Sequence, residues 1–109
     1  MRDHGLYIDY ASDYDFADGV RTILFFHATW CHTCREADTS ILASLDDIPE
    51  NVVIVKVDYD SNIALREKYG VTGQHTFVEV NESGNKMRSV RGSTSTNDFL
   101  DDLLGGVSE

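Results

Sequence analysis

Two short apolar runs separated by a helical pattern constrain the fold of this chain more than any other feature of its sequence. The first run is Thr22–His27 and the second is Val52–Val57. Continuous apolar runs of this length are typical of strands that are covered on both faces. Between them, apolar residues recur at helical spacing from Ala37 to Ile48, and Pro49 ends the pattern. A strand, a helix and a second strand in this order predict a right-handed crossover between two parallel strands.

Three further helices are expected from local signals. Ser12 is a suitable N-cap residue for a short helix. Gly70 stands where a glycine in the left-handed conformation commonly follows the last turn of a helix. The last helix is indicated by two apolar pairs spaced four residues apart. The expected ranges are Ser12–Asp18, Asp60 or Ser61 to Tyr69, and about Ser95 to Leu104.

A hairpin is expected near the C-terminal end of the chain. Thr76–Val80 and Lys86–Val90 have the composition of strands, and the segment NESGN between them is a turn signal. These antiparallel strands add an edge to the parallel pair. The sequence therefore predicts an α/β fold in which a mixed central sheet carries helices on both faces, in a single domain over residues 1–109.

Composition limits the partners and the location of the protein. Its formal net charge is −10, from 19 acidic and 9 basic side chains. Nucleic acids and anionic membranes favour clustered Lys and Arg, so neither is an expected partner. The longest apolar run, Ile23–Phe26, is too short to span a membrane. Without a signal peptide the chain is expected to be cytoplasmic; a cell-envelope location applies instead if an export signal or lipid anchor precedes Met1 in the full protein.

Both cysteines lie three residues apart, in the segment TWCHTC directly after the first apolar run. Two thiols at this spacing can form a disulfide, bind a metal or attack the disulfide of another molecule. Cys31 is expected at the start of a helix, where unpaired N–H groups and the helix dipole stabilise an anion. There the pKa of a thiol falls to roughly 3.5–7.5, from about 8.5. Cys34 lies one turn further in, so Cys31 is the expected nucleophile and Cys34 the resolving thiol.

The segments ILFFHATWCHTC, VKVDYD, KYGVTGQHTFV and VRG, at their spacing in this chain, resemble the thioredoxin family over nearly the whole sequence. The resemblance implies a thioredoxin fold and a protein-disulfide reductase that uses Cys31 and Cys34. The implied partners are disulfide-containing proteins, together with an external reductase or a membrane electron donor that recycles the dithiol. A monomer without a resident cofactor is expected.

The resemblance also assigns roles to residues around the cysteines. Trp30 is expected to cover the thiols, and Lys56 to lie beneath the site. Gly92 is expected to let a substrate backbone approach, and the loop Gln74–Thr76 to pair with an extended substrate segment. The residues expected to bind substrate are therefore Trp30, Gln74, His75, Thr76 and Gly92.

Three substitutions depart from the family pattern, one of which is His27 in place of the large aromatic residue four positions before Cys31. His75 takes the place of the family's cis-proline. Because a cis bond before a non-proline residue costs about 3–4 kcal/mol, the Gln74–His75 bond is expected to be trans and the loop remodelled. Phe25 takes the place of the buried acid that accepts the proton of the resolving cysteine, which deprives Lys56 of its usual partner. Glu79 is either a replacement for that acid or a solvated strand residue.

Three histidines are expected around the two sulfurs: His27, His32 and His75. As proton handlers, their imidazoles could replace the missing acid, and a cationic His32 would stabilise the Cys31 thiolate. Residues expected to shape the site or to handle protons are Trp30, His32, Thr33, His27 and Lys56.

The same residues also allow a metal site. Cys31, Cys34 and His75 form a Cys₂His set, and water, His27 or a partner molecule could fill the fourth position. The alternative function is therefore a module that holds zinc or an iron–sulfur cluster with little redox turnover. A thiol-regulated scaffold is a third possibility.

Overall fold

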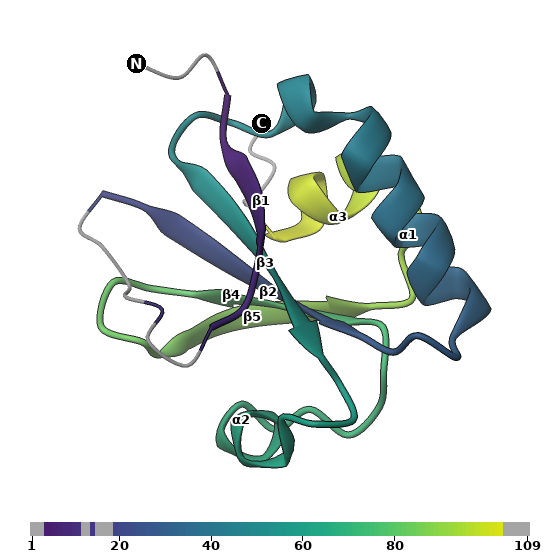
Figure 1. Ribbon diagram of the computed structural model, residues 1–109. Helices are drawn as coiled ribbons and strands as arrows, with labels where there is room; N and C mark the ends of the chain where they lie inside the picture. Colours follow the sequence, from purple (N-terminus) through teal and green to yellow (C-terminus); the bar gives the residue numbers. More distant parts are fainter. Residues whose placement is uncertain (1–3, 12–13, 15–18, 104–109) are drawn as a thin grey trace.

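A computed structural model describes residues 4–11, 14 and 19–103 of the chain, and Figure 1 shows its mixed five-stranded sheet. The strands lie in the order β1-β3-β2-β4-β5. As the sequence predicts, β2 and β3 are parallel, and β1 is parallel to β3. β4 is antiparallel to both of its neighbours, β2 and β5. The strands are β1 (Leu6–Asp9), β2 (Arg21–His27), β3 (Val52–Asp58), β4 (Thr76–Val80) and β5 (Lys86–Arg91).

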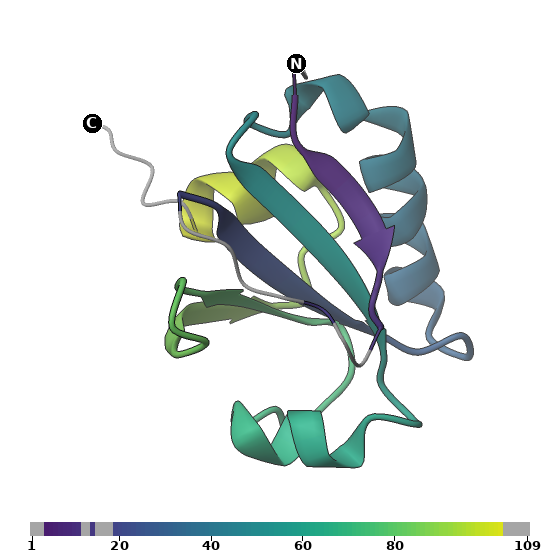
Figure 2. The same ribbon diagram turned by 60° about the vertical axis from the view of Figure 1, so that its left-hand side comes forward.

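The described helices cover both faces of the sheet, which confirms the expected layers. α1 (His32–Ala43) and α3 (Thr96–Leu103) lie against one face, and α2 (Ile63–Lys68) lies on the other (Figures 1 and 2). None of the helices in the described ranges is long and apolar enough to cross a membrane. The helix expected at Ser12–Asp18 falls outside the described residues except for Tyr14, and the single-domain assignment stays a prediction.

Two helix boundaries differ from the expectation. The helical pattern that continues to Ile48 is divided, because α1 ends at Ala43 and a separate 3-10 turn follows at Leu45–Asp47. The cap of α2 is Asn62 rather than Asp60 or Ser61. Ser61 belongs to the preceding turn, where its N–H and its hydroxyl both donate to the Asp58 carboxylate, at 3.1 and 2.6 Å.

The apolar runs of β2 and β3 divide between two cores because successive side chains of a strand point to opposite faces. Under α1 and α3, Phe25, Phe77 and Phe99 stack with ring centroids 4.5 and 4.1 Å apart. The alternate residues of β2 and β3 point to the opposite face of the sheet. There they form a second core under α2, which includes Tyr69. Gly70 has a φ of +67°, which confirms its expected place after the helix. Both central strands are therefore covered on each side.

Candidate functional site

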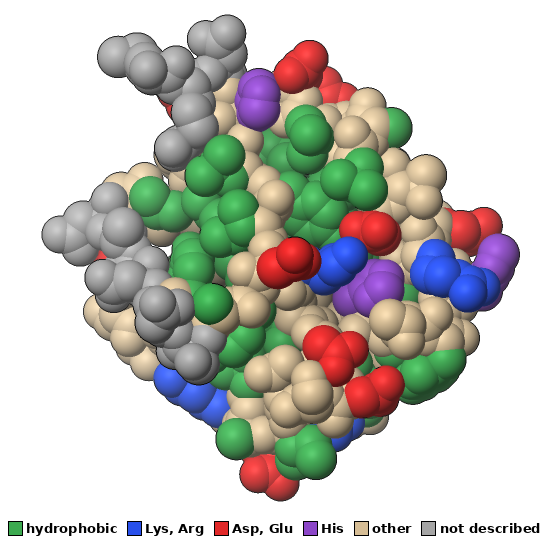
Figure 3. Space-filling view, viewed as in Figure 1, with side chains coloured by type: hydrophobic (Ala, Val, Ile, Leu, Met, Phe, Trp, Pro, Cys, Tyr) green, Lys and Arg blue, Asp and Glu red, His purple; other side chains and the backbone are tan. Residues whose placement is uncertain are grey.

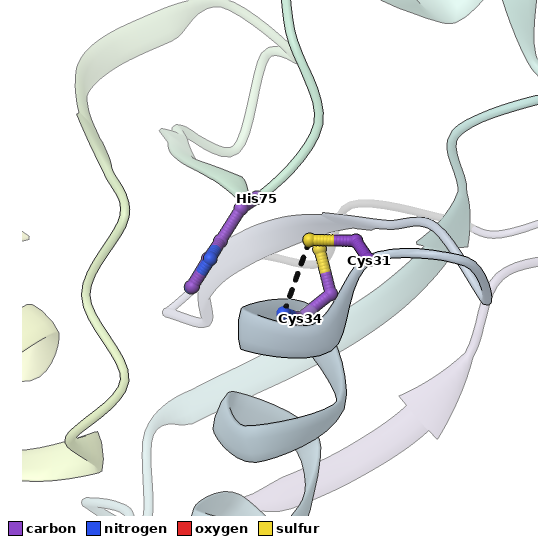
Figure 4. Close-up of side chains that lie close together, drawn as sticks. All are labelled: Cys31, Cys34 and His75. Atoms are coloured by element: carbon purple, nitrogen blue, oxygen red, sulfur yellow. Dashed lines mark hydrogen bonds between the residues drawn. The ribbon is translucent and has the colours of Figure 1, made fainter.

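The two cysteines lie at the junction between β2 and α1. The chain leaves β2 at His27, and Cys31 becomes the N-cap residue of α1 with an extended backbone (φ −93°, ψ 113°). Its sulfur accepts a hydrogen bond from the Cys34 N–H at 3.2 Å, drawn in Figure 4. Both cysteines are free thiols; Cys31 is 5% exposed and Cys34 fully buried. The expected helix start and the one-turn offset between the thiols are both present.

The surroundings of the two thiols push their pKa values apart. Burial opposes ionisation of Cys31, but hydrogen bonds from the Cys34 thiol, the Cys34 N–H and the Gln74 side chain outweigh it, so the pKa of Cys31 is lowered. For Cys34, burial, the hydrogen bond to Cys31 and the charge of Cys31 raise the pKa to about 12. One thiol of the pair is therefore poised to ionise and the other to stay protonated.

His75 lies on the loop before β4, beside the two sulfurs (Figure 4). Its φ of +62° places it in the left-handed region, where a non-glycine residue is uncommon. Among the described residues no peptide bond is cis, so the Gln74–His75 bond is trans as expected. The backbone of His75 is anchored at both ends, because its N–H donates to Phe26 and its carbonyl accepts from Gly92, each at 2.9 Å. The loop thus holds a side chain that faces the thiols, and its remodelling relative to the family stays a prediction.

The hydrogen bonds of the His75 ring define its tautomer. Nε2 lies 2.7 Å from the carbonyl oxygen of Ser93, which can only accept, so Nε2 carries the proton. In the neutral ring Nδ1 then accepts, and its partner at 2.9 Å is the Thr33 hydroxyl. The same hydroxyl lies 3.4 Å from the Cys31 sulfur. Thr33 therefore connects the imidazole to the nucleophilic thiol.

Of the three histidines expected around the sulfurs, only His75 lies beside them in the described part of the chain. His32 is exposed on α1, and its Nε2 lies 3.4 Å from the Glu36 carboxylate. His27 lines a cavity of about 490 Å³ with Lys56 and Asp58 at the ends of the parallel strands. Acidic, basic and histidine side chains lie close together near the centre of this face (Figure 3). Proton handling by His27 and His32 stays a prediction.

Lys56 has a partner that the sequence did not indicate. Its Nζ lies 3.4 Å from a carboxylate oxygen of Asp38, and the same oxygen accepts from the Tyr7 hydroxyl at 2.6 Å. Burial, and then the hydrogen bond to Asp38, raise the pKa of Tyr7. Asp38 is four residues after Cys34 on α1, so a carboxylate lies one turn from the resolving thiol although β2 supplies none. The only feature of the sequence that could have indicated Asp38 is its position four residues after Cys34.

Both interpretations of Glu79 were wrong. Its side chain is buried, being 3% exposed, so it is not a solvated strand residue. It accepts from the Arg21 Nε at 2.6 Å, and the Arg88 Nε lies 3.9 Å away. Arg21 begins β2, whereas the cysteines follow the end of that strand. Glu79 therefore neutralises arginines at the opposite end of the sheet and does not replace the missing acid.

The other expected substrate residues are Trp30, Thr76 and Gly92, and cover of the thiols by Trp30 stays a prediction. Trp30 is 57% exposed, and its indole N–H donates to Asp60 at 2.8 Å. Gly92 has a φ of +84° and open space where a Cβ would be, so its backbone conformation is the reason for glycine there. At the start of β4, the Thr76 hydroxyl donates to the Gly73 carbonyl at 2.8 Å. Contacts of these residues with a substrate stay predictions.

Comparisons with known proteins agree with this geometry. Residues 11–104 match the thioredoxin family model. The chain is 33% identical over 70 residues to thioredoxin-1 of Drosophila melanogaster, a match that spans 64% of this chain and 65% of that protein. It is 29% identical over 86 residues to a thioredoxin of Chlamydia trachomatis, covering 76% of this chain and 83% of that one. A solved mutant thioredoxin from Halobacterium salinarum superposes with a TM-score of 0.72 at 27% identity, over 98% of this chain and 93% of the other.

Proposed function

Because this chain belongs to the thioredoxin family, we propose that it is a thiol–disulfide oxidoreductase, and more narrowly a protein-disulfide reductase that uses Cys31 and Cys34 as its redox couple. The observation that carries this proposal is the difference between the two thiols. Cys31 caps α1 with a lowered pKa, whereas Cys34 is fully buried and has a pKa raised to about 12. A dithiol of this kind suits a two-step exchange in which one sulfur attacks first.

In the first step the Cys31 thiolate attacks one sulfur of a substrate disulfide. A bond forms between Cys31 and that sulfur, and the substrate disulfide breaks and releases one substrate thiolate. In the second step Cys34 loses its proton and attacks the Cys31 sulfur, which releases the second substrate thiolate. The Cys31–Cys34 disulfide that results has given two electrons to the substrate, and the two thiolates take up protons.

Substrate pairing at the loop before β4 falls mainly to Gln74. Both backbone groups of His75 already bond within the sheet region, to Phe26 and Gly92. The carbonyl of Gln74 accepts instead from the flexible Arg91 side chain, at 3.2 Å. An extended substrate segment displaces that side chain and adds its backbone beside Gln74, as at a sheet edge. Trp30 supplies an exposed aromatic surface at the side of Cys31.

Turnover requires a source of electrons outside the chain. The dithiol provides two electrons per cycle, so a second redox partner must reduce the Cys31–Cys34 disulfide again. An external reductase or a membrane electron donor fulfils this role. We expect the substrates to be proteins with accessible disulfides, because a disulfide must reach the small exposed area of the Cys31 sulfur.

The proposal is tested by insulin reduction with dithiothreitol as the electron source. Two matched substitutions one helical turn apart separate the roles of the thiols. Cys31→Ser is expected to abolish all reduction above the rate with dithiothreitol alone and to form no mixed disulfide. Cys34→Ser is also expected to stop turnover; once it has been reduced and freed of dithiothreitol, it is expected to accumulate a stable mixed disulfide with insulin that non-reducing electrophoresis detects. Reduction by Cys31→Ser, or equal trapping by both variants, would contradict the assignment.

A further inference from the structure

The two sulfurs and the imidazole of His75 form a set of ligands suited to a thiophilic metal. The sulfurs of Cys31 and Cys34 and one ring nitrogen of His75 all lie within 4.8 Å of one another, and the three residues are buried. Figure 4 shows the sulfurs side by side at the start of α1, with His75 opposite them on the loop before β4. Thiolate and imidazole are the ligands that zinc favours in proteins. We propose that the reduced chain binds one zinc ion through Cys31, Cys34 and His75, and that the disulfide form does not.

The separations match a tetrahedral ion after a small adjustment. Zinc binds sulfur at about 2.3 Å and nitrogen at about 2.0–2.1 Å, which sets ligand atoms roughly 3.6–3.8 Å apart. The three atoms are at most 4.8 Å apart. They need to draw together by no more than about 1.2 Å, the difference between 4.8 and about 3.6 Å, which side-chain rotation can supply.

The ring of His75 is already oriented for this role. Its Nε2–H donates to the Ser93 carbonyl at 2.7 Å, which leaves the lone pair on Nδ1. Metal-binding histidines almost always donate their second ring N–H to a carbonyl or carboxylate in this way. The Nδ1 lone pair is held by the Thr33 hydroxyl at 2.9 Å, and that hydroxyl is next to the Cys31 sulfur. Zinc therefore takes the place of the Thr33 hydrogen bond.

Three protein ligands favour a single zinc ion over a cluster. His27 lines the cavity at the strand ends and is not among the gathered atoms, so it is not the fourth ligand in the described structure. The fourth position is left to water, as in zinc sites that keep one position open. An iron–sulfur cluster is commonly held by four protein ligands, of which this group supplies three.

Zinc binding and disulfide formation exclude each other, because both use the same sulfurs. Zinc replaces two thiol protons when it binds, so the reduced chain and Zn²⁺ give the zinc complex and two H⁺. Oxidation by a substrate disulfide takes two electrons from the sulfurs, forms the Cys31–Cys34 bond, and releases the zinc and two substrate thiolates, which take up two protons from water. Free zinc at 100 times its dissociation constant therefore favours the reduced form about 100-fold, which raises the reduction potential of the disulfide by about 59 mV and makes the dithiol a weaker reductant.

The test is a zinc titration of the reduced full-length chain under anaerobic conditions, in competition with a chromophoric chelator. We expect one zinc per chain, and none for the disulfide form. His75→Asn keeps a side chain that tolerates a positive φ, and it is expected to weaken zinc binding about 100-fold or more. His4→Asn is the matched control, because the ring of His4 lies near Asp46 rather than the sulfurs, and its zinc affinity is expected to equal that of the wild type. With cobalt, the wild type is expected to show thiolate charge-transfer and tetrahedral d–d bands.

Thr33→Val separates coordination from general damage to the site. Because zinc must displace the Thr33 hydroxyl, removal of that hydroxyl is expected to tighten zinc binding by up to about tenfold. The proposal is overturned if reduced wild type binds no zinc, if His75→Asn binds as tightly as wild type, or if iron and sulfide reconstitute a cluster instead. Insulin reduction in the presence of a zinc chelator tests the proposed reductase function separately.

Discussion

Alkylation of the reduced protein at neutral pH measures how differently the two thiols ionise. The perturbation is a limiting amount of iodoacetamide at about pH 7, which reacts with thiolates and not with thiols. The pKa of Cys31 is lowered from its ordinary value of 9.0, and that of Cys34 is raised to about 12. The thiolate population of Cys31 therefore exceeds that of Cys34 by at least about 1,000-fold.

Intrinsic reactivity offsets part of this difference. A thiolate of higher pKa is the stronger nucleophile, and a Brønsted coefficient of about 0.5 over three pKa units returns about 30-fold to Cys34. We therefore expect Cys31 to be labelled at least about 30 times faster. Fragmentation mass spectrometry of the peptide that carries both cysteines gives the ratio, and the same measurement in concentrated urea, where the ratio approaches one, is the control.

The pH dependence gives a second check on the same reasoning. Because hydrogen bonds to its sulfur lower the pKa of Cys31, its labelling rate is expected to rise with pH and to level off below pH 9.0. Equal labelling of the two thiols, preferential labelling of Cys34, or a midpoint at or above pH 9.0 would refute the unequal ionisation on which the proposed mechanism rests.

Three further predictions concern the surroundings of the site, with urea unfolding as the measurement. Asp38→Asn removes the charge that accepts the Tyr7 hydroxyl and is expected to lower the free energy of unfolding by about 1–2 kcal/mol; the exposed Asp102→Asn should change it by less than about 0.5 kcal/mol. Burial lowers the pKa of His27 from 6.5, so the unfolded chain takes up the proton first and stability falls as pH drops from 6.5 through the folded-state pKa. His27→Phe should therefore lose less stability than wild type over that pH range. Phe77→Ala opens a cavity between two stacked rings and is expected to cost about 3–5 kcal/mol; a cost below about 1 kcal/mol would contradict the packing.

Most of the fold was predictable because its signals are local. The apolar runs of β2 and β3 lack polar alternation, which indicates strands covered on both faces. The turn signal before β5 and the glycine after α2 gave the hairpin and the helix end. The start of α2 was predicted less accurately, because a residue that can cap a helix can also form hydrogen bonds within a turn. The Asp58 carboxylate takes Ser61 into a turn, and α2 begins two residues later.

The charged partner of Lys56 could not be predicted from the sequence. The absence of an acid at Phe25 was visible in the sequence, and Glu79 was the replacement considered. The partner that the fold supplies for Lys56 is Asp38, which reaches it from α1 across the helix–sheet interface. No local pattern specifies such a contact, since it depends on how α1 is rotated over the sheet and on which way each side chain points.

The sequence alone determined that two thiols start a helix after a buried strand, because helix starts and strand runs are recorded in short-range residue patterns. Only the tertiary structure decided that Cys34 is fully buried, that His75 rather than His27 or His32 joins the sulfurs, and that the His75 ring is held by Ser93. These features arise between segments far apart in the chain. Their burial and hydrogen bonds set the difference in pKa between the thiols, and that difference exists only in the packed molecule.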